Sequence, residues 1–210
     1  MEIDTKELFN DVIGNVISNI NDKKDSNKLV KAFEIKEKSD FKVKNGSSTD
    51  QKVDAIVNAA NKMLMSGGGV CGAIFRKAGY DKLTEACKKI KTPLKDGDAV
   101  ITLAFNIKNA KYIIHAVGPD FGNKSDAYDE LFNSYYNSLK VLKENNLHSI
   151  SFPLISSGIF GGNLDNPSLE SAKQCKKAFN KFIYDYPDYK INVLLCAFTK
   201  DEYINIINNL

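Results

Sequence analysis

Residues 53–61 read Val-Asp-Ala-Ile-Val-Asn-Ala-Ala-Asn, and residues 66–70 read Ser-Gly-Gly-Gly-Val. The first stretch is an apolar, β-branched run that ends in small residues and amides, which is typical of a buried strand. A glycine triplet follows within a few residues and precedes a helical pattern. A strand that ends at a glycine-rich turn before a helix brings bare backbone N–H groups close to an anion. This stretch therefore predicts a phosphate-binding turn, with amide side chains suited to a nucleotide beside it.

The composition indicates one globular domain with an N-terminal appendage. The chain has 210 residues, of which 43% are hydrophobic, enough to bury a sizeable core. Its 29 basic and 26 acidic residues give a net charge of +3, which is too balanced to indicate nucleic-acid binding. No apolar run approaches the roughly 20 residues that a membrane-spanning helix needs. The N-terminus lacks the apolar core of a signal peptide, so we expect a cytoplasmic protein without a membrane partner.

The cysteines and histidines predict no metal site. The four cysteines are widely spaced without a C-x-x-C pair, and there are only two histidines. We therefore expect free thiols rather than disulfides or zinc ligands. Cys196 and His115 each lie in an apolar strand pattern, so we expect a buried thiol and a buried core histidine. Cys71 follows the glycine triplet and is expected at the mouth of the site.

Hydrophobic periodicity predicts strands that alternate with helices. We expect helices over 5–21, 69–78, 82–90, 129–145, 168–184 and 201–209, and strands over 41–43, 55–58, 98–104, 112–117, 149–155 and 191–198. This alternation predicts a three-layer α/β/α fold with a mixed, largely parallel sheet. Residues 1–29 would form an N-terminal helical extension and residues 30–210 the domain itself. In such sheets ligands bind at the carboxyl ends of the strands.

A second glycine-rich loop strengthens the prediction of a phosphate site. Residues 156–162 read Ser-Ser-Gly-Ile-Phe-Gly-Gly and follow the strand expected over 149–155. One glycine triplet is a weak signal, but two such loops at strand ends of one sheet are a stronger one. If both loops face one cleft, their backbone N–H groups can hold a diphosphate from two sides.

Four sequence blocks resemble the macrodomain family, the ADP-ribose-binding module. They are 53–61, 67–74 (Gly-Gly-Gly-Val-Cys-Gly-Ala-Ile), 115–119 (His-Ala-Val-Gly-Pro) and 153–161 (Pro-Leu-Ile-Ser-Ser-Gly-Ile-Phe-Gly), in the order that the family has them. The resemblance covers about residues 30–210. It implies the macrodomain fold, with ADP-ribose and mono-ADP-ribosylated proteins as partners, and neither a metal nor a cofactor.

The resemblance also implies roles for individual residues. Asn61, Gly69 and Phe160 would be catalytic, with Asn61 holding the distal ribose and Phe160 packing on it. Phe198 would lie against the adenine, where aromatic stacking stabilises a base by about 1–3 kcal/mol. The ligand-binding residues implied in this way are Ser47, Ser48, Ala59, Gly67, Gly68, Val70, Cys71, Leu154, Ser156, Ser157, Gly158, Ile159 and Phe198.

The sequence departs from the family pattern in three places. The family usually has Gly-Asp-Ile where this chain has Gly-Ser-Ser at 46–48, and its aspartate accepts a hydrogen bond from the adenine amino group. Asp50 is the alternative acceptor if the loop folds differently. Many hydrolases of the family carry an aspartate and a histidine where Cys71 and Phe75 stand. Residues 162–163 are Gly-Asn in place of a Tyr-Pro or Phe-Pro continuation.

These residues imply a mono-ADP-ribosyl hydrolase that acts as a monomer on esters of aspartate or glutamate side chains. Deacetylation of O-acetyl-ADP-ribose is a further activity open to it. Since Cys71 replaces the aspartate, a water held by an α-phosphate oxygen would attack C1″ of a ribose positioned by Asn61 and the loops. The alternative is a non-catalytic reader of ADP-ribosylated proteins, which the residues at 47, 71 and 75 favour. Binding of RNA in the same cleft is a third hypothesis, against which the balanced charge argues.

Overall fold

The computed structural model describes residues 39–210. The helix expected over 5–21, and with it the extension over 1–29, lies outside the described residues. The elements in chain order are β1 (Asp40–Asn45), η1 (Ser48–Asp50), β2 (Ala55–Ala60), α3 (Gly69–Ala78), α4 (Tyr80–Lys88), β3 (Ala99–Leu103), β4 (Tyr112–Val117), α5 (Tyr128–Glu144), β5 (Ser149–Pro153), η2 (Ile159–Gly161), α6 (Pro167–Asp185), β6 (Asn192–Ala197) and α7 (Lys200–Asn209).

The strands of residues 39–210 form one six-stranded sheet in the order β1-β6-β5-β2-β4-β3. Every neighbouring pair is parallel except β3 and β4, which are antiparallel. The sheet is therefore mixed and largely parallel, as predicted. Parallel pairing needs crossover connections, and the helices between the strands provide them.

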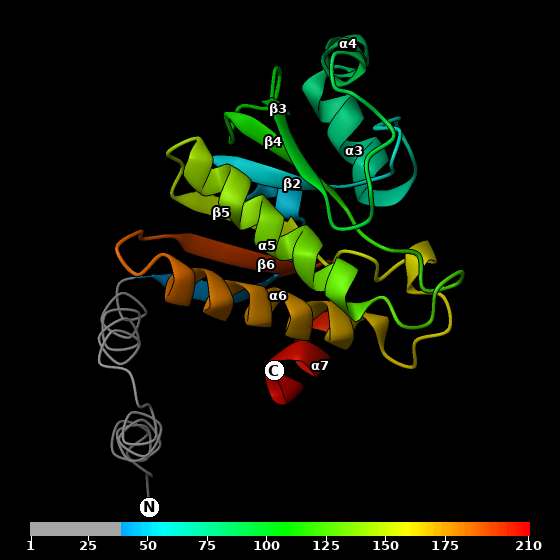
Figure 1. The fold of residues 1–210 in the computed structure, drawn as a ribbon, viewed down its shortest axis with the longest axis vertical. Coiled ribbons are helices and arrows are strands. Elements are labelled where there is room, and N and C mark those ends of the chain that lie inside the picture. Colours follow the sequence, from blue (N-terminus) through cyan, green and yellow to red (C-terminus); the bar gives the residue numbers. More distant parts are fainter. Residues whose placement is uncertain (1–38) are drawn as a thin grey trace, which may run out of the picture.

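The sheet is buried on both faces because its central strand alternates between two cores. Ala55 and Val57 of β2 pack in the cluster that contains residues of α5 and α6. Ile56 and Ala60 point the other way, into the cluster with residues of α3 and α4. This alternation has the period of two that a strand requires. Figure 1 shows α5 and α6 crossing one face of the sheet and α3 and α4 lying apart from them.

The elements expected within residues 39–210 are confirmed with small differences at their ends. No end differs by more than two residues, and one such difference is in β5, which ends at Pro153 rather than at residue 155. Ile155 leaves the strand ladder because its N–H donates to the Tyr135 hydroxyl at 2.8 Å and its carbonyl accepts from Ser171 Oγ at 2.6 Å. The single-turn helices η1 and η2 were not predicted, because one turn has no detectable periodicity.

Cys196 and His115 are buried, as expected from the sequence. All four cysteines are free and buried. His115 is fully buried and bonded on both ring nitrogens, to Asn58 Nδ2 at 3.1 Å and to Thr102 Oγ1 at 2.9 Å. Burial lowers the pKa of this histidine to about 4, so the ring is neutral. Among the helices of residues 39–210, none is both long and apolar enough to cross a bilayer.

Candidate functional site

The carboxyl ends of three neighbouring strands meet at one cavity. Strands β6, β5 and β2 lie side by side in the sheet, so the segments that follow them converge on one edge. There they enclose a cavity of about 750 Å³, a size typical of small-molecule sites. Every predicted site residue lines it: Ser47, Ser48, Ala59, Asn61, Gly67, Gly68, Gly69, Val70, Cys71, Leu154, Ser156, Ser157, Gly158, Ile159, Phe160 and Phe198. The structure thus brings the whole set together, while the role of each residue toward a ligand stays a prediction.

Asn61 shapes the turn after β2. Its Oδ1 accepts from the amides of Met63 and Met65, both at 3.1 Å, and its Nδ2 donates to the Met65 carbonyl at 2.7 Å. These hydrogen bonds close residues 61–65 into a compact turn and lead the chain back to the glycine triplet. The Asn61 side chain, which is predicted to hold a ribose, therefore also stabilises the turn that forms this wall of the cavity.

The first glycine loop presents unused backbone donors at the start of α3. The amides of residues 67–71 make no hydrogen bond to any described residue. Gly72 lets this loop pack closely on the helix, because a Cβ there would lie 2.5 Å from the carbonyl oxygen of Gly67. Free N–H groups at a helix N-terminus, together with the helix dipole, favour a bound anion.

The second loop presents a similar row of donors after β5. Ser156 has a φ of +57°, and its hydroxyl donates to the Pro119 carbonyl at 2.7 Å. The Ser157 hydroxyl donates to the Leu154 carbonyl at 2.9 Å. Both hydroxyls are therefore used to build the loop, and its donors to a ligand are backbone groups. The amides of residues 156–160 make no hydrogen bond within the described part of the chain.

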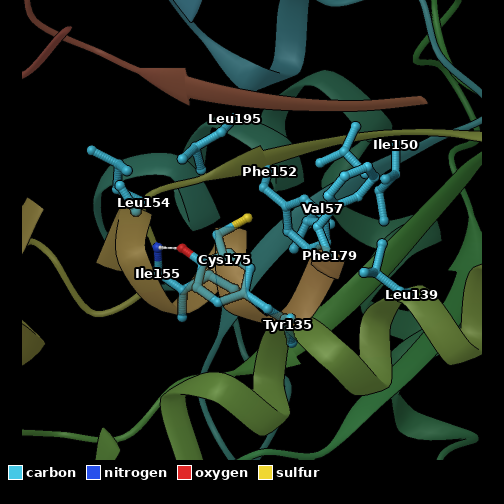
Figure 2. Close-up of a cluster of buried hydrophobic side chains, with 14 of the residues drawn as sticks. Val57, Tyr135, Leu139, Ile150, Phe152, Leu154, Ile155, Cys175, Phe179 and Leu195 are labelled. Carbon is cyan, nitrogen blue, oxygen red and sulfur yellow. Dashed lines mark hydrogen bonds between the residues drawn. The ribbon is translucent and has the colours of Figure 1, made fainter. Parts of the chain in front are cut away.

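A buried polar network anchors this second loop to the core. The Tyr135 hydroxyl accepts from the Ile155 amide at 2.8 Å and lies 2.7 Å from Ser171 Oγ, which in turn donates to the Ile155 carbonyl. Figure 2 shows the Tyr135 hydroxyl meeting the Ile155 amide inside the hydrophobic cluster. Burial raises the pKa of Tyr135 well above its ordinary value, so the phenol stays neutral. Two helices thereby fix where the loop begins.

The departure at residue 162 has a steric reason. Gly162 has a φ of +52°, and a Cβ there would collide with the backbone of Gly122. The same contact region includes a hydrogen bond of 2.9 Å from the Phe121 amide to the Phe160 carbonyl. The loop after η2 thus packs directly on the 121–122 backbone, and only glycine fits at this position.

Positions 71 and 75 hold no acid or base. Cys71 is 5% exposed, and its Sγ lies 3.7 Å from the Met65 carbonyl. Phe75 is buried in the core cluster shared with α4. No group of three or more metal-ligating side chains gathers within residues 39–210. The chemistry available at this wall of the cavity is positioning by backbone donors rather than proton transfer by a side chain.

Asp50 does not replace the missing aspartate. Its carboxylate forms an ion pair with Lys77 of α3, and the residue does not line the cavity. The hydrogen bond from Lys77 lowers the pKa of this carboxyl. The Ser47 hydroxyl makes two hydrogen bonds within its own turn. It caps η1 by accepting from the Thr49 amide at 3.2 Å, and it shares a hydrogen bond with Thr49 Oγ1 at 2.9 Å. The alternative that the sequence left open at Asp50 is therefore wrong.

Sequence reasoning missed two charged residues of the wall, Arg76 and Glu202. Arg76 lies seven residues after Gly69 on one face of α3, so helical spacing from the glycine triplet could have found it. Glu202 is the third residue of α7 and closes a capping box with Thr199, and this box fixes the first turn of α7 beside Phe198. The remaining lining residues that were missed are Gly46, Ala60, Ala73, Gly118, Pro153, Ile155 and Cys196.

Comparison with known proteins agrees with this geometry. A model of the Macro domain family matches residues 57–168. An O-acetyl-ADP-ribose deacetylase from Escherichia fergusonii is 43% identical over 150 residues, which cover 70% of this chain and 81% of that protein. The ADP-ribose glycohydrolase MACROD1 of Mus musculus is 39% identical over 160 residues, covering 75% of this chain and 47% of that longer protein. The Oceanobacillus iheyensis macrodomain with ADP has a TM-score of 0.74 and 31% identity, covering 82% of this chain and 90% of that one.

Proposed function

This chain belongs to the macrodomain family, and we propose that it binds ADP-ribose and removes mono-ADP-ribose from modified proteins by hydrolysis at C1″. The observation that carries the proposal is the pair of free amide rows, residues 67–71 and 156–160, on facing loops of one cavity. Such rows bind a diphosphate without lysine or arginine. Relatives named as an ADP-ribose glycohydrolase and an O-acetyl-ADP-ribose deacetylase support a hydrolase.

The order of the strands supports one orientation of the ligand. The segment after β6 carries Phe198, an aromatic side chain that is 77% exposed and can stack on a base. The loop after β5 lies next to it in the sheet and offers free amides to the diphosphate. The turn after β2 follows, with Asn61 and the first glycine loop beside the distal ribose. The base, the phosphates and the ribose would therefore lie in this order along the sheet edge.

The proposed reaction suits a site in which positions 71 and 75 hold neither an aspartate nor a histidine. Attack of water at C1″ forms a new C1″–O bond and breaks the bond to the acyl oxygen of the modified side chain. The leaving group is a carboxylate, whose pKa near 4 means that it needs no proton to depart. The proton of the water passes through an α-phosphate oxygen to solvent. The protein's contribution is then to hold the ribose, the phosphate and the water in place.

The direct test is hydrolysis of an acceptor protein that carries ADP-ribose on aspartate or glutamate. We expect release of ADP-ribose within hours, measured by mass spectrometry. In water enriched in oxygen-18, attack at C1″ leaves the acceptor carboxylate unlabelled, whereas attack at the ester carbonyl labels it. Gly68→Val is the matched control, because Gly68 has an extended backbone and a Cβ there meets no atom within 4 Å. This variant should fold and lose binding, since its side chain occupies the mouth of the cavity.

Other outcomes would separate the alternatives. Calorimetric binding of ADP-ribose with no release would contradict the hydrolase and favour the reader, which positions 71 and 75 leave as the second candidate. Absence of binding would reject both. Affinity for oligonucleotides that falls steeply with salt would favour RNA binding instead.

A further inference from the structure

The base end of the cavity is built by two segments that the sheet places together. Strands β1 and β6 are paired in parallel up to Asn45 and Ala197. Just beyond this pair the Gly46 amide donates to the Ala197 carbonyl at 2.8 Å. The turn over 46–48 therefore lies beside Phe198, and these residues line the cavity together with Glu202 from the first turn of α7.

Neither serine of this turn offers a charged acceptor to a base. The Ser47 hydroxyl accepts from the Thr49 amide and shares a hydrogen bond with Thr49 Oγ1, so its oxygen keeps at most one neutral acceptor site. Ser48 is 3% exposed, and its hydroxyl oxygen is buried without a partner among the described residues. A carboxylate acceptor for an amino group therefore has to come from another element.

Within residues 39–210, Glu202 is the one carboxylate among those that line the cavity. The structure holds it in place from α6 and α7. One oxygen accepts from the Thr199 amide at 2.9 Å and from Thr199 Oγ1 at 3.1 Å, and the other accepts from Ser168 Oγ at 3.0 Å. A carboxylate has about four acceptor sites, so the oxygen that faces Ser168 retains one for a ligand.

We propose that Glu202 is the residue that selects the base, and that it favours a purine with an exocyclic amino group over one with a keto group. This inference rests on the proposed binding of ADP-ribose. A carboxylate only accepts hydrogen bonds, so the 6-amino group of adenine can satisfy its free site. The 6-keto oxygen of hypoxanthine is itself an acceptor and would be repelled by the Glu202 carboxylate oxygen. This repulsion is the element that disfavours the wrong ligand. Glu202 thereby offers from α7 the charged acceptor that the 46–48 turn lacks.

The test compares two ligands on the full chain by calorimetry: ADP-ribose and its hypoxanthine analogue. We expect the natural protein to bind ADP-ribose at least about tenfold more tightly, as a site that hydrogen-bonds a polar group rejects the analogue lacking it. Glu202→Gln keeps the size of the side chain but adds a donor, so we expect the preference to fall to about threefold or less.

Two variants control for the capping role of Glu202. Thr199→Val removes the hydroxyl that caps α7 and leaves the carboxylate its hydrogen bonds from the Thr199 amide and Ser168 Oγ, so it should lower the melting temperature and keep the preference. Asp201→Asn removes a neighbouring charge that does not line the cavity and should change neither. An unchanged preference in Glu202→Gln would overturn the inference, as would an equal loss of preference in Thr199→Val. If the natural protein binds neither ligand, the proposed function itself fails.

Discussion

Asn61 and Met65 hold each other through two hydrogen bonds, one from Asn61 Nδ2 to the Met65 carbonyl at 2.7 Å and one from the Met65 amide to Asn61 Oδ1 at 3.1 Å. The Asn61 side chain thus lines the cavity and also closes the turn that precedes the glycine triplet. A loss of activity on mutation could come from either role, so the two have to be separated by measurement.

Asn61→Ala removes the hydrogen bonds that close the turn, together with the amide proposed to hold the distal ribose. We expect the free energy of unfolding to fall by about 1–2 kcal/mol, since hydrogen bonds contribute roughly 1 kcal/mol each. Hydrolysis should fall by at least about tenfold, because the ribose is no longer held in position. Asn137→Ala is a matched control, since the Asn137 side chain also bonds a backbone carbonyl, that of Gly97 at 2.8 Å, and does not line the cavity. Full turnover of Asn61→Ala would show that the turn needs no amide side chain at this position.

Tyr135→Phe tests whether the core positions the second loop. The change leaves the buried Ile155 amide without its acceptor, so we expect a loss of about 1–3 kcal/mol in stability. The loop over 156–160 then loses its fixed start, and ADP-ribose should bind about fivefold more weakly, or about 1 kcal/mol.

Tyr189→Phe separates this positioning effect from simple destabilisation. Its hydroxyl donates to the Leu147 carbonyl at 2.8 Å, before the start of β5 and therefore at the opposite end of the strand from the loop. This control should lower the melting temperature without changing the affinity. Equal affinity losses in both variants would refute a specific link between Tyr135 and the loop.

Cys71→Ala distinguishes a lining thiol from a nucleophile. Cys71 is buried, and its only polar contact among the described residues is the distant Met65 carbonyl. We expect turnover of the alanine variant to stay within about threefold of the natural protein, because removal of a true covalent nucleophile costs a thousandfold or more. Steady-state rates on the ester-linked acceptor decide between these outcomes, and a loss of the larger size would assign Cys71 to covalent catalysis.

The sequence was sufficient to predict the strands whose ends form the site. Buried strands such as β2 have a local signal, and the glycine triplet after Asn61 marks a turn whatever the rest of the chain does. The end of β5 could not be predicted, because Leu154 and Ile155 are as apolar as the strand before them. What removes Ile155 from the ladder is the Tyr135 hydroxyl, which belongs to another element.

The same reasoning explains the errors within the site. The spacing of residues correctly placed Ser156 and Ser157 at the cavity, but it could not show that their hydroxyls bond the Pro119 and Leu154 carbonyls. Glu202 was missed since its capping box reads as an ordinary helix start. Only the pairing of β1 with β6 brings that helix beside the 46–48 turn. Side-chain hydrogen bonds and contacts of this kind depend on how segments pack in three dimensions, and a local sequence pattern does not predict them.

His115 predicts how stability depends on pH. Burial lowers its pKa from 6.5 to about 4 in the folded chain. Between these values the unfolded chain binds a proton that the folded chain does not, so stability is greatest above pH 6.5 and is lost as the pH falls toward 4. The full loss is about 3 kcal/mol, from roughly 1.4 kcal/mol for each unit of pKa.

The matched variant is His115→Gln, whose amide can bond Asn58 and Thr102 but does not titrate. Carboxylates such as Asp54, whose pKa is held low by hydrogen bonds from His148 and Ser149 in spite of burial, destabilise both proteins at more acidic pH. The informative quantity is therefore the difference between the two unfolding free energies, measured by urea titration from pH 7.5 to 4.5. We expect the advantage of the natural protein over the variant to shrink steadily as the pH falls below 6.5. A difference in unfolding free energy that stays constant across this range would show that His115 binds its proton equally in the folded and unfolded chains. Burial beside Asn58 and Thr102 would then not keep the ring neutral.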